Sequence, residues 1–418
     1  MDKLVVQSAD TLHGQLQRGL GRGARRAAGT PGAGELVYDC IRRDPRWDLQ
    51  VESRSLFYAR LILDLELPVG PIAEHLAGSD ADGTDGWDPE PRRDGLAVEV
   101  LADLLRLSRR DAAGPLRRYA EEGAHWYDAL HALAEVGDPV LAAGLDEVAA
   151  TRCDDEDLRW LVIEPDNAVV QDWMRRQPRI AAAVAERRHG GRPRLECTRR
   201  PDCSGSSDAE LLDQARRRGD SAVAAILELG RRRSPGLLDI AEELLTGERG
   251  RYGGAMCRAI RDLGPLALPR ARVWAAHRPG CADVGMAVLA RHGTEQDVPA
   301  LLKDLDAAVR ERSWGAAAGP IEGLGRLRSG IAVPLLKSTW AETAYSYLRP
   351  RLLTALARTA PHSAEAYATE GLWDCEEDVR ETAVAGAPPK ADNLLRIRRL
   401  RGCAAEDPDV RSAAALRL

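Results

Sequence analysis

The chain has 418 residues, a length that favours two or three domains or an elongated repeat array over one compact core. Aromatic residues make up only 4%, so the core must rest on alanine, leucine and valine, which favours packed helices over a β-sandwich. The net charge of −6 gives no global cationic signal for nucleic acid. Lysine supplies only four of the 59 basic side chains, and this dominance of arginine indicates either a GC-rich coding sequence or recognition of phosphate or carboxylate groups.

The cysteines and the apolar segments predict the compartment. Eight cysteines are scattered along the chain without a CxxC pair, which is typical of reduced thiols. The N-terminus has no apolar segment suited to secretion, and no run of about 18 apolar residues occurs anywhere. We therefore expect a cytoplasmic protein that does not contact a membrane.

The first 77 residues predict an irregular helical pair. Apolar side chains recur at helical spacing from Leu56 to Leu65, and Pro68 and Pro71 then interrupt the pattern. Because the end of a repeat array needs a face without a neighbour, we expect residues 1–77 to form an N-terminal helical cap.

Two segments without helical periodicity divide the rest of the chain. Residues 78–95 form an acidic loop rich in glycine and proline, and its aspartates do not follow the register of a calcium-binding loop. Helical repeats are expected over 96–186, an arginine- and glycine-rich linker over 187–207, and further repeats over 208–418. His189, Cys197 and Cys203 in the linker lack a fourth ligand for zinc, so we expect no metal and no cofactor. Ser207 and Glu210 form a capping box that predicts a helix start.

Two ten-residue stretches near the end of the chain repeat each other. "DVRETAVAGA" begins at Asp378 and "DVRSAAALRL" at Asp409, which places Arg349, Arg380 and Arg411 in one 31-residue frame. Similar stretches rich in small residues occur upstream and start at Trp126, Ser221, Arg251, Asp283 and Arg312. A recurring period of this length indicates a repeat architecture.

A short turn and a second helix are expected after these stretches. Val298-Pro299, Val333-Pro334 and Asp138-Pro139 each follow a glycine within five residues. Glycine ends a helix by adopting positive φ, and proline is tolerated in the first turn of the next helix. Helix, turn and helix, recurring about every 30–37 residues, is the hairpin unit of an α-solenoid.

The "DVR" start, the small-residue first helix and the "AVP" turn resemble the HEAT-repeat family, most clearly over 221–418. This resemblance implies an all-α fold, a right-handed α-solenoid of HEAT-like helix pairs. A fold-level resemblance implies no function by itself.

Arginines are concentrated between residues 175 and 233, a segment that contains fifteen arginines and eight acidic residues. Such a patch can neutralise phosphates, whereas arginine near a helix C-terminus can also serve only the helix dipole. The candidate binding residues are Arg175, Arg176, Arg216, Arg217, Arg218, Arg231, Arg232 and Arg233.

One branch of HEAT-like proteins, the alkylpurine DNA glycosylases, combines tryptophan faces with a carboxylate. The resemblance implies Trp126 and Asp128 as the candidate pair here, although no stretch matches the family's catalytic motif. P-loop, G-x-S-x-G and HExxH motifs are also missing from the sequence.

We therefore expect a non-enzymatic scaffold that holds a macromolecular partner, a protein, on the concave face of the solenoid. Nucleic-acid binding, with glycosylase activity, is the alternative. The final segment from Asp409 reads as the first helix of a repeat. If this helix is a C-terminal cap, we expect Val410, Ala414 and Leu416 to pack back on the preceding helix. The sequence leaves open whether this helix is a cap or an open edge, and it does not indicate the oligomeric state.

Overall fold

The computed structural model describes residues 5–79, 95–161, 167–189, 203–245 and 250–418. In these ranges every regular element is a helix and no strand occurs, as the composition predicts. None of the described helices is long and apolar enough to cross a membrane. Most of the predicted loop (80–94 of 78–95) and of the predicted linker (190–202 of 187–207) lies outside the described residues.

The chain forms two compact units, and one of them is discontinuous in sequence. Unit 1 comprises Met1–Arg194, Ala344–Tyr347 and Glu365–Leu418, and unit 2 comprises Leu195–Thr343 and Leu348–Ala364. The segments at the two ends of the sequence therefore fold together in unit 1.

Unit 1 contains short helices from both ends of the sequence. They are α1 (Leu12–Gln17), α2 (Gly21–Ala27), α3 (Ala33–Arg43), α4 (Ser55–Asp64), α5 (Gly70–Ser79), α6 (Gly95–Arg106), η2 (Arg110–Ala112), α7 (Ala113–Glu122), α8 (Trp126–Val136), α9 (Leu145–Arg152), α10 (Asp155–Leu161), α11 (Ala168–Arg176), α12 (Pro178–His189), α24 (Glu377–Gly386), α25 (Ala391–Gly402) and α26 (Pro408–Arg417).

η7 and α23 cross the boundary between the units. Unit 2 contains the helices of the middle of the chain. They are α13 (Asp208–Arg216), α14 (Ala222–Arg231), α15 (Leu237–Leu245), α16 (Gly250–Leu263), η3 (Gly264–Ala267), α17 (Leu268–His277), η4 (Pro279–Cys281), α18 (Ala282–His292), η5 (Glu295–Asp297), α19 (Val298–Arg310), α20 (Trp314–Arg326), η6 (Gly330–Ala332), α21 (Val333–Glu342), η7 (Ser346–Leu348), α22 (Arg349–Thr359) and α23 (Pro361–Gly371).

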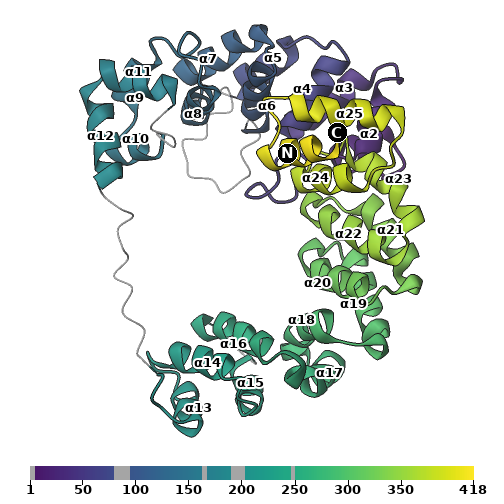
Figure 1. The fold of residues 1–418 in the computed structure, drawn as a ribbon. Helices are drawn as coiled ribbons and strands as arrows, with labels where there is room; N and C mark the ends of the chain where they lie inside the picture. The colour runs from purple at the N-terminus through teal and green to yellow at the C-terminus, as the bar shows by residue number, and fades with distance from the viewer. Residues whose placement is uncertain (1–4, 80–94, 162–166, 190–202, 246–249) are drawn as a thin grey trace. The chain divides into compact units, whose positions relative to one another are not determined.

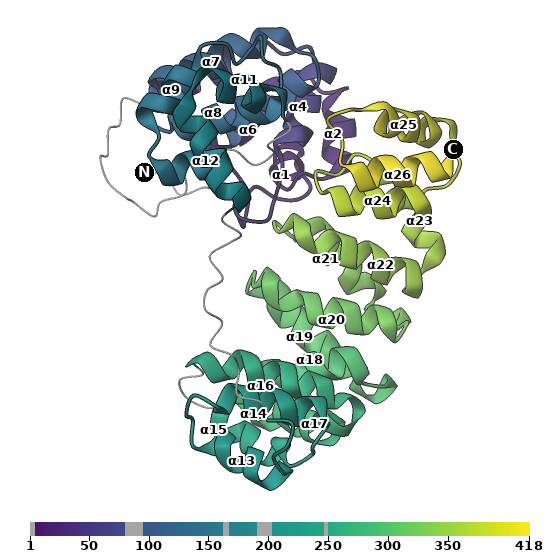
Figure 2. The same ribbon diagram turned by 60° about the vertical axis from the view of Figure 1, so that its left-hand side comes forward.

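Neighbouring helices pack in chain order. In unit 2 the small-residue helices contact one another from α14 to α16, α18, α20 and α22, and α13, α17, α19 and α21 pack against α14, α18, α20 and α22 respectively. Figure 2 shows α18, α20 and α22 in succession. The same pattern occurs in unit 1, where α4 contacts α6, α6 contacts α8, and α24 contacts α26. The predicted first helices are thus the helices that stack.

Glycine allows the stacked helices to approach closely. A Cβ atom at Gly230 of α14 would lie 2.7 Å from Ala259 of α16, and one at Gly325 of α20 would lie 2.7 Å from Ala355 of α22. Both distances are shorter than real Cβ contacts, so a side chain there would push the two helices apart.

Several local predictions are confirmed, and one is wrong. Proline lies in the first turn of α19 and α21, and Ser207 and Glu210 form the predicted capping box at the start of α13. A helix starting at Pro139 is not observed. Turns occupy 139–144, and α9 starts only at Leu145 because Gly144 has a φ of 84°, which a helix cannot contain.

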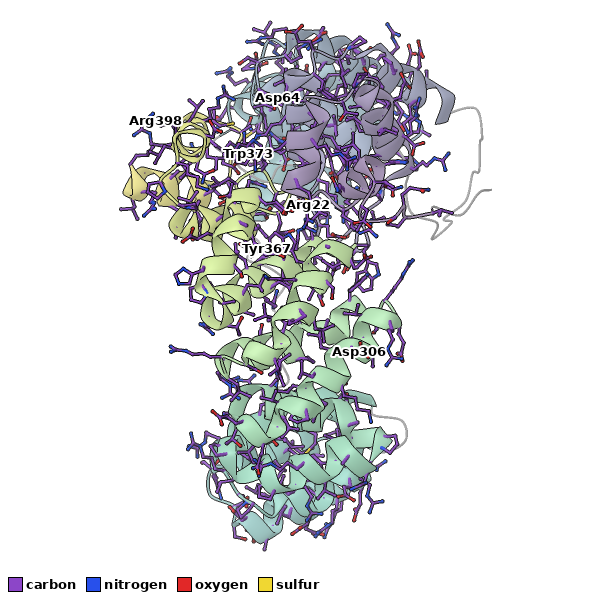
Figure 3. All side chains as sticks on the ribbon, turned by 90° about the vertical axis from the view of Figure 1, so that its right-hand side faces the viewer. Arg22, Asp64, Asp306, Tyr367, Trp373 and Arg398 are labelled. Atoms are coloured by element: carbon purple, nitrogen blue, oxygen red, sulfur yellow. The ribbon has the colours of Figure 1, made fainter. Side chains whose placement is uncertain are left out.

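The N-terminal segment that we expected to be a cap contacts the C-terminal helices inside unit 1. Cys375 donates its backbone N–H to Gly19, and Arg22 of α2 pairs with Glu370 at 2.9 Å. Figure 1 shows α2 to α4 beside α24 and α25, and Figure 3 labels Arg22 and Trp373 where these segments meet.

The last helix, α26, packs on α24 and α25. Val410 and Ala414 are buried as predicted, whereas Leu416 is 91% exposed. The prediction for Leu416 was wrong because Val410 and Ala414 are four residues apart and share one helix face, while Leu416 lies two residues further on, about 200° around the helix.

Candidate functional site

A carboxylate buried in unit 1 joins the loop before α4 to a distant segment of the chain. One oxygen of Glu52 accepts hydrogen bonds from Arg54 and from the backbone N–H and hydroxyl of Ser346, each at 2.7 Å. Its other oxygen accepts from the backbone N–H groups of Trp47 and Asp48, at 2.6 and 2.9 Å. Burial alone would raise the pKa of Glu52, but Arg54 and these donors lower the pKa to about 2.

Arg54 is fully buried beside Glu52. Its guanidinium group donates to the carbonyl oxygens of Gln17, Pro45 and Ala344. Burial would lower the pKa of Arg54, but the Glu52 carboxylate outweighs that effect and raises the pKa. The charge is therefore matched by a carboxylate and by carbonyl dipoles, as a buried arginine requires.

A second buried carboxylate lies just before α26. Glu406 pairs with Arg380 of α24 and with Arg60 of α4, both at 2.7 Å. Arg380 also donates to the carbonyl oxygens of Asp374 and Cys375. These arginines overcome the effect of burial and lower the pKa of Glu406 to about 2.

The Glu52 pairings fix the loop that precedes α4, and this loop carries exposed apolar side chains. Trp47 is 47% exposed and its ring lies 4.7 Å from that of Tyr345, which lies 5.7 Å from the ring of Tyr347. Leu49 and Val51 are exposed on the same loop. We call Trp47, Leu49, Val51, Tyr345 and Tyr347 the aromatic patch. Exposed apolar clusters of this kind mark interaction sites.

A cavity of about 690 Å³ adjoins the patch. Arg46 and Leu49 of the loop line it, together with side chains from α4, α6, α8, α24 and the turn before α26. We call it the unit 1 cavity. Its size is that of a typical ligand or peptide pocket.

Carboxylates outnumber arginines in the lining of the unit 1 cavity. The arginines are Arg46, Arg106 and Arg380, and the carboxylates are Glu99, Asp103, Asp128, Glu135, Glu377 and Asp407, a formal balance of −3. Burial raises the pKa of Glu99 and the nearby Asp44 and Asp103 add to this, more than Arg46 offsets. The formal charges of the lining therefore leave the cavity negative, although burial disfavours the ionised form of Glu99.

The predicted catalytic pair lies on α8 but does not form one site. The guanidinium carbon of Arg152 lies 4.3 Å from the centre of the Trp126 ring, so a cation of the chain itself covers a face of that ring. Asp128 instead lines the unit 1 cavity.

The predicted binding arginines are divided between the units and mostly pair with nearby acids. In unit 1, Arg175 and Arg176 at the end of α11 pair with Asp172 at 3.0 and 2.9 Å. In unit 2, Arg217 pairs with Asp213, Arg218 donates to the carbonyl oxygen of Glu243, and Arg216 is exposed. These groups neutralise local acids and helix ends.

The arginines that end α14 are also paired. Arg231 and Arg232 both contact Glu228 at 2.7 Å, and their hydrogen bonds lower its pKa to about 2. Arg231 and Arg233 line a second cavity, of about 730 Å³, together with Arg258. This second cavity brings together two of the predicted binding residues, Arg231 and Arg233.

Sequence reasoning missed Glu52, Arg54 and Glu406, which build the unit 1 site. The 31-residue frame of Arg349 and Arg380 could have indicated buried arginines, because both side chains are buried in the first turn of a helix. Among the described residues, no group of three or more histidine, cysteine or acidic side chains could hold a metal ion.

No protein-family model matches the chain, and comparisons with curated proteins and with solved structures likewise give no match.

Proposed function

We propose that this chain is a non-enzymatic scaffold that binds a protein partner through the unit 1 cavity and the aromatic patch. The observation that carries this proposal is the position of the exposed Trp47 and Leu49 on a loop held by the buried Glu52. A rigid aromatic side chain beside a cavity is typical of protein interfaces, where tryptophan and tyrosine contribute much of the binding energy.

Ion pairs hold several charged groups around the cavity in place. Arg46 pairs with Asp44 and Glu99, Arg106 with Asp103 and Glu135, and Arg380 with Glu406 outside the cavity lining. Side chains that are already fixed lose little entropy when a partner docks, which supports a binding role.

We further propose that the stacked helices of unit 2 form a right-handed HEAT-like α-solenoid. Support comes from the regular contacts of α14, α16, α18, α20 and α22 and from the helix starts at proline. The seven described cysteines are free thiols, which supports a reducing compartment such as the cytoplasm.

The test is capture and reconstitution of the partner. We expect the tagged chain to capture a protein in stoichiometric amount from its native cells. The purified pair should then form a complex of defined mass in light scattering. The double variant Trp47→Ala/Glu377→Gln weakens that complex at least about tenfold, because it removes an interface anchor and a cavity charge. The matched control Trp160→Ala/Glu147→Gln changes an exposed tryptophan and an exposed acid elsewhere in unit 1 and leaves the affinity unchanged. Equal affinity of the two double variants would refute the proposal.

Nucleic-acid binding is the second candidate, favoured by Arg231, Arg233 and Arg258, which line the second cavity described above, in unit 2. Duplex DNA titrated at about 50 mM salt, where phosphate contacts are strongest, tests it. Binding that weakens with salt and with Arg233→Ala would support this candidate, and no binding would end it.

A further inference from the structure

The aromatic patch and the unit 1 cavity form one continuous surface. Leu49 belongs to the patch and also lines the cavity, and Arg46, directly before Trp47, lines it as well. Arg46 is held by two carboxylates at 2.6 and 3.0 Å, with only 5% of its side chain exposed, so this end of the loop is anchored. A partner that covers Trp47 and Leu49 therefore also contacts the lining of the cavity.

The loop is ordered before any partner arrives. Besides the two backbone donors to Glu52, Asp48 accepts the N–H of Gln50 at 3.0 Å, and its carbonyl accepts the N–H of Glu52 at 3.1 Å. Exposed apolar side chains on an ordered loop cost little entropy when they are covered, which favours a docking role.

The charge of the cavity selects the occupant. Two of its three arginines have a carboxylate partner outside the lining, Asp44 for Arg46 and Glu406 for Arg380. Carboxylates outside the lining therefore already balance the positive charge of these two arginines. The six carboxylates of the lining then outnumber the positive charge that remains to balance them. An anionic ligand would be repelled here, and a cationic one attracted.

We propose that the partner docks with a basic segment that carries an apolar anchor: the anchor covers Trp47, Leu49 and Tyr347, and arginine or lysine side chains enter the cavity toward Glu135 and Glu377. This inference rests on the proposed function and specifies the chemistry of its partner. Apolar contact supplies affinity, and the carboxylates supply orientation and rate of association.

The experiment uses the full chain and three fluorescein-labelled peptides of about 12 residues, which reach about 40 Å in extended form. One alternates arginine and leucine, the second alternates glutamate and leucine, and the third alternates arginine and serine. Fluorescence anisotropy at about 50 mM salt should show the arginine-leucine peptide binding at least about tenfold more tightly than either of the others.

Matched variants locate the binding. Trp47→Ala and Glu377→Gln should each weaken the arginine-leucine peptide severalfold, whereas Trp160→Ala and Glu147→Gln, which change exposed residues on α10 and α9, should not. Hydrogen exchange of residues 45–53 should slow in the complex. Because the substituted side chains are exposed or partly exposed, thermal unfolding is expected to stay unchanged and serves as the folding control.

Three results would overturn the inference: equal binding of the glutamate-leucine peptide, equal binding of the arginine-serine peptide, or equal losses in the control variants. None of these results refutes the proposed function, because a partner of different chemistry could bind the same surface. Its binding would still be weakened by the double variant Trp47→Ala/Glu377→Gln. Conversely, if the captured partner binds the two double variants equally, the proposed function fails even where the peptides bind as expected.

Discussion

Two arginines of unit 1 and two arginines of unit 2 have different roles. In unit 1, Arg54 and Arg380 are buried, and each donates to a buried carboxylate and to backbone carbonyl oxygens. The carbonyl groups that Arg54 contacts include those of the distant Gln17 and Ala344, whereas those of Arg380 lie just before α24. In unit 2, Arg217 and Arg231 are about three-quarters exposed and pair with an acid within one helical turn. The Arg380–Glu406 pair thus joins α24 to the turn before α26, and Arg54 joins the loop before α4 to Gln17 and Ala344 through their carbonyl oxygens. The exposed pairs of unit 2 stay within one helix end. Burial decides between these roles, because desolvation makes an unmatched charge costly.

The largest expected effect is that of Arg54→Met. The substitution leaves the Glu52 carboxylate buried without its cation and should lower the free energy of unfolding of unit 1 by about 3–5 kcal/mol. Hydrogen exchange of peptides from residues 12–79 measures it. The double variant Glu52→Gln/Arg54→Met should recover part of the loss, since it buries no unpaired charge. Arg217→Met in unit 2 is the control and should change nothing measurable.

Acid should destabilise unit 1 through its two buried carboxylates. Folding lowers the pKa of Glu52 and of Glu406 from the ordinary 4.5 to about 2. The stabilisation is therefore present above pH 4.5 and is lost as the pH falls toward 2, by about 3 kcal/mol for each group at the low-pH limit. Chemical denaturation followed between pH 7 and pH 3 should show the decline. Glu406→Gln should flatten it, whereas a profile unchanged from the wild type would contradict the assignment.

The local elements could be predicted from the sequence, and the buried pairs could not. Ser207 with Glu210, and the prolines that start α19 and α21, act over a few residues, so their patterns are visible in the chain. Glu52 and Ser346 are 294 residues apart, and nothing local marks either of them. Acidic and basic side chains are also rarely buried, so sequence reasoning assigns them to the surface.

The candidate site divides in the same way. The arginine clusters were conspicuous in the sequence, yet most of them pair with acids three or four residues away. The unit 1 cavity combines side chains from the loop before α4, from α6 and α8, and from α24. No periodicity in the sequence brings these elements together, because their contact depends on the packing of both ends of the chain into unit 1.

A smaller effect is expected where glycine sets the helix spacing in unit 2. Gly230→Ala places a Cβ atom 2.7 Å from Ala259, so α14 and α16 must separate, at a cost of about 1–3 kcal/mol. Gly254→Ala in α16 is the matched control, because nothing lies within 4 Å of a Cβ atom there. Alanine is also the better helix former, so the control should be neutral or stabilising by up to about 1 kcal/mol. Thermal unfolding separates the two, and equal midpoints would argue against the close approach.

The smallest effect is expected from Arg231→Ala, and it concerns a pKa rather than stability. The hydrogen bond from Arg231 is the main cause of the low pKa of Glu228, with Arg232 second. Removing Arg231 should raise that pKa from about 2 part of the way toward 4.5. Thermal unfolding should stay nearly unchanged, because the Arg231 side chain is 70% exposed and Glu228 keeps its pair with Arg232. Carbon NMR of labelled glutamate side chains measures the titration. Arg233→Ala, which removes a neighbouring charge that does not act on Glu228, is the control. A shift of equal size in both variants would mean that the general field of the arginine cluster, and not the hydrogen bond, holds Glu228 ionised, and the contrast between buried and exposed arginines would then rest on unit 1 alone.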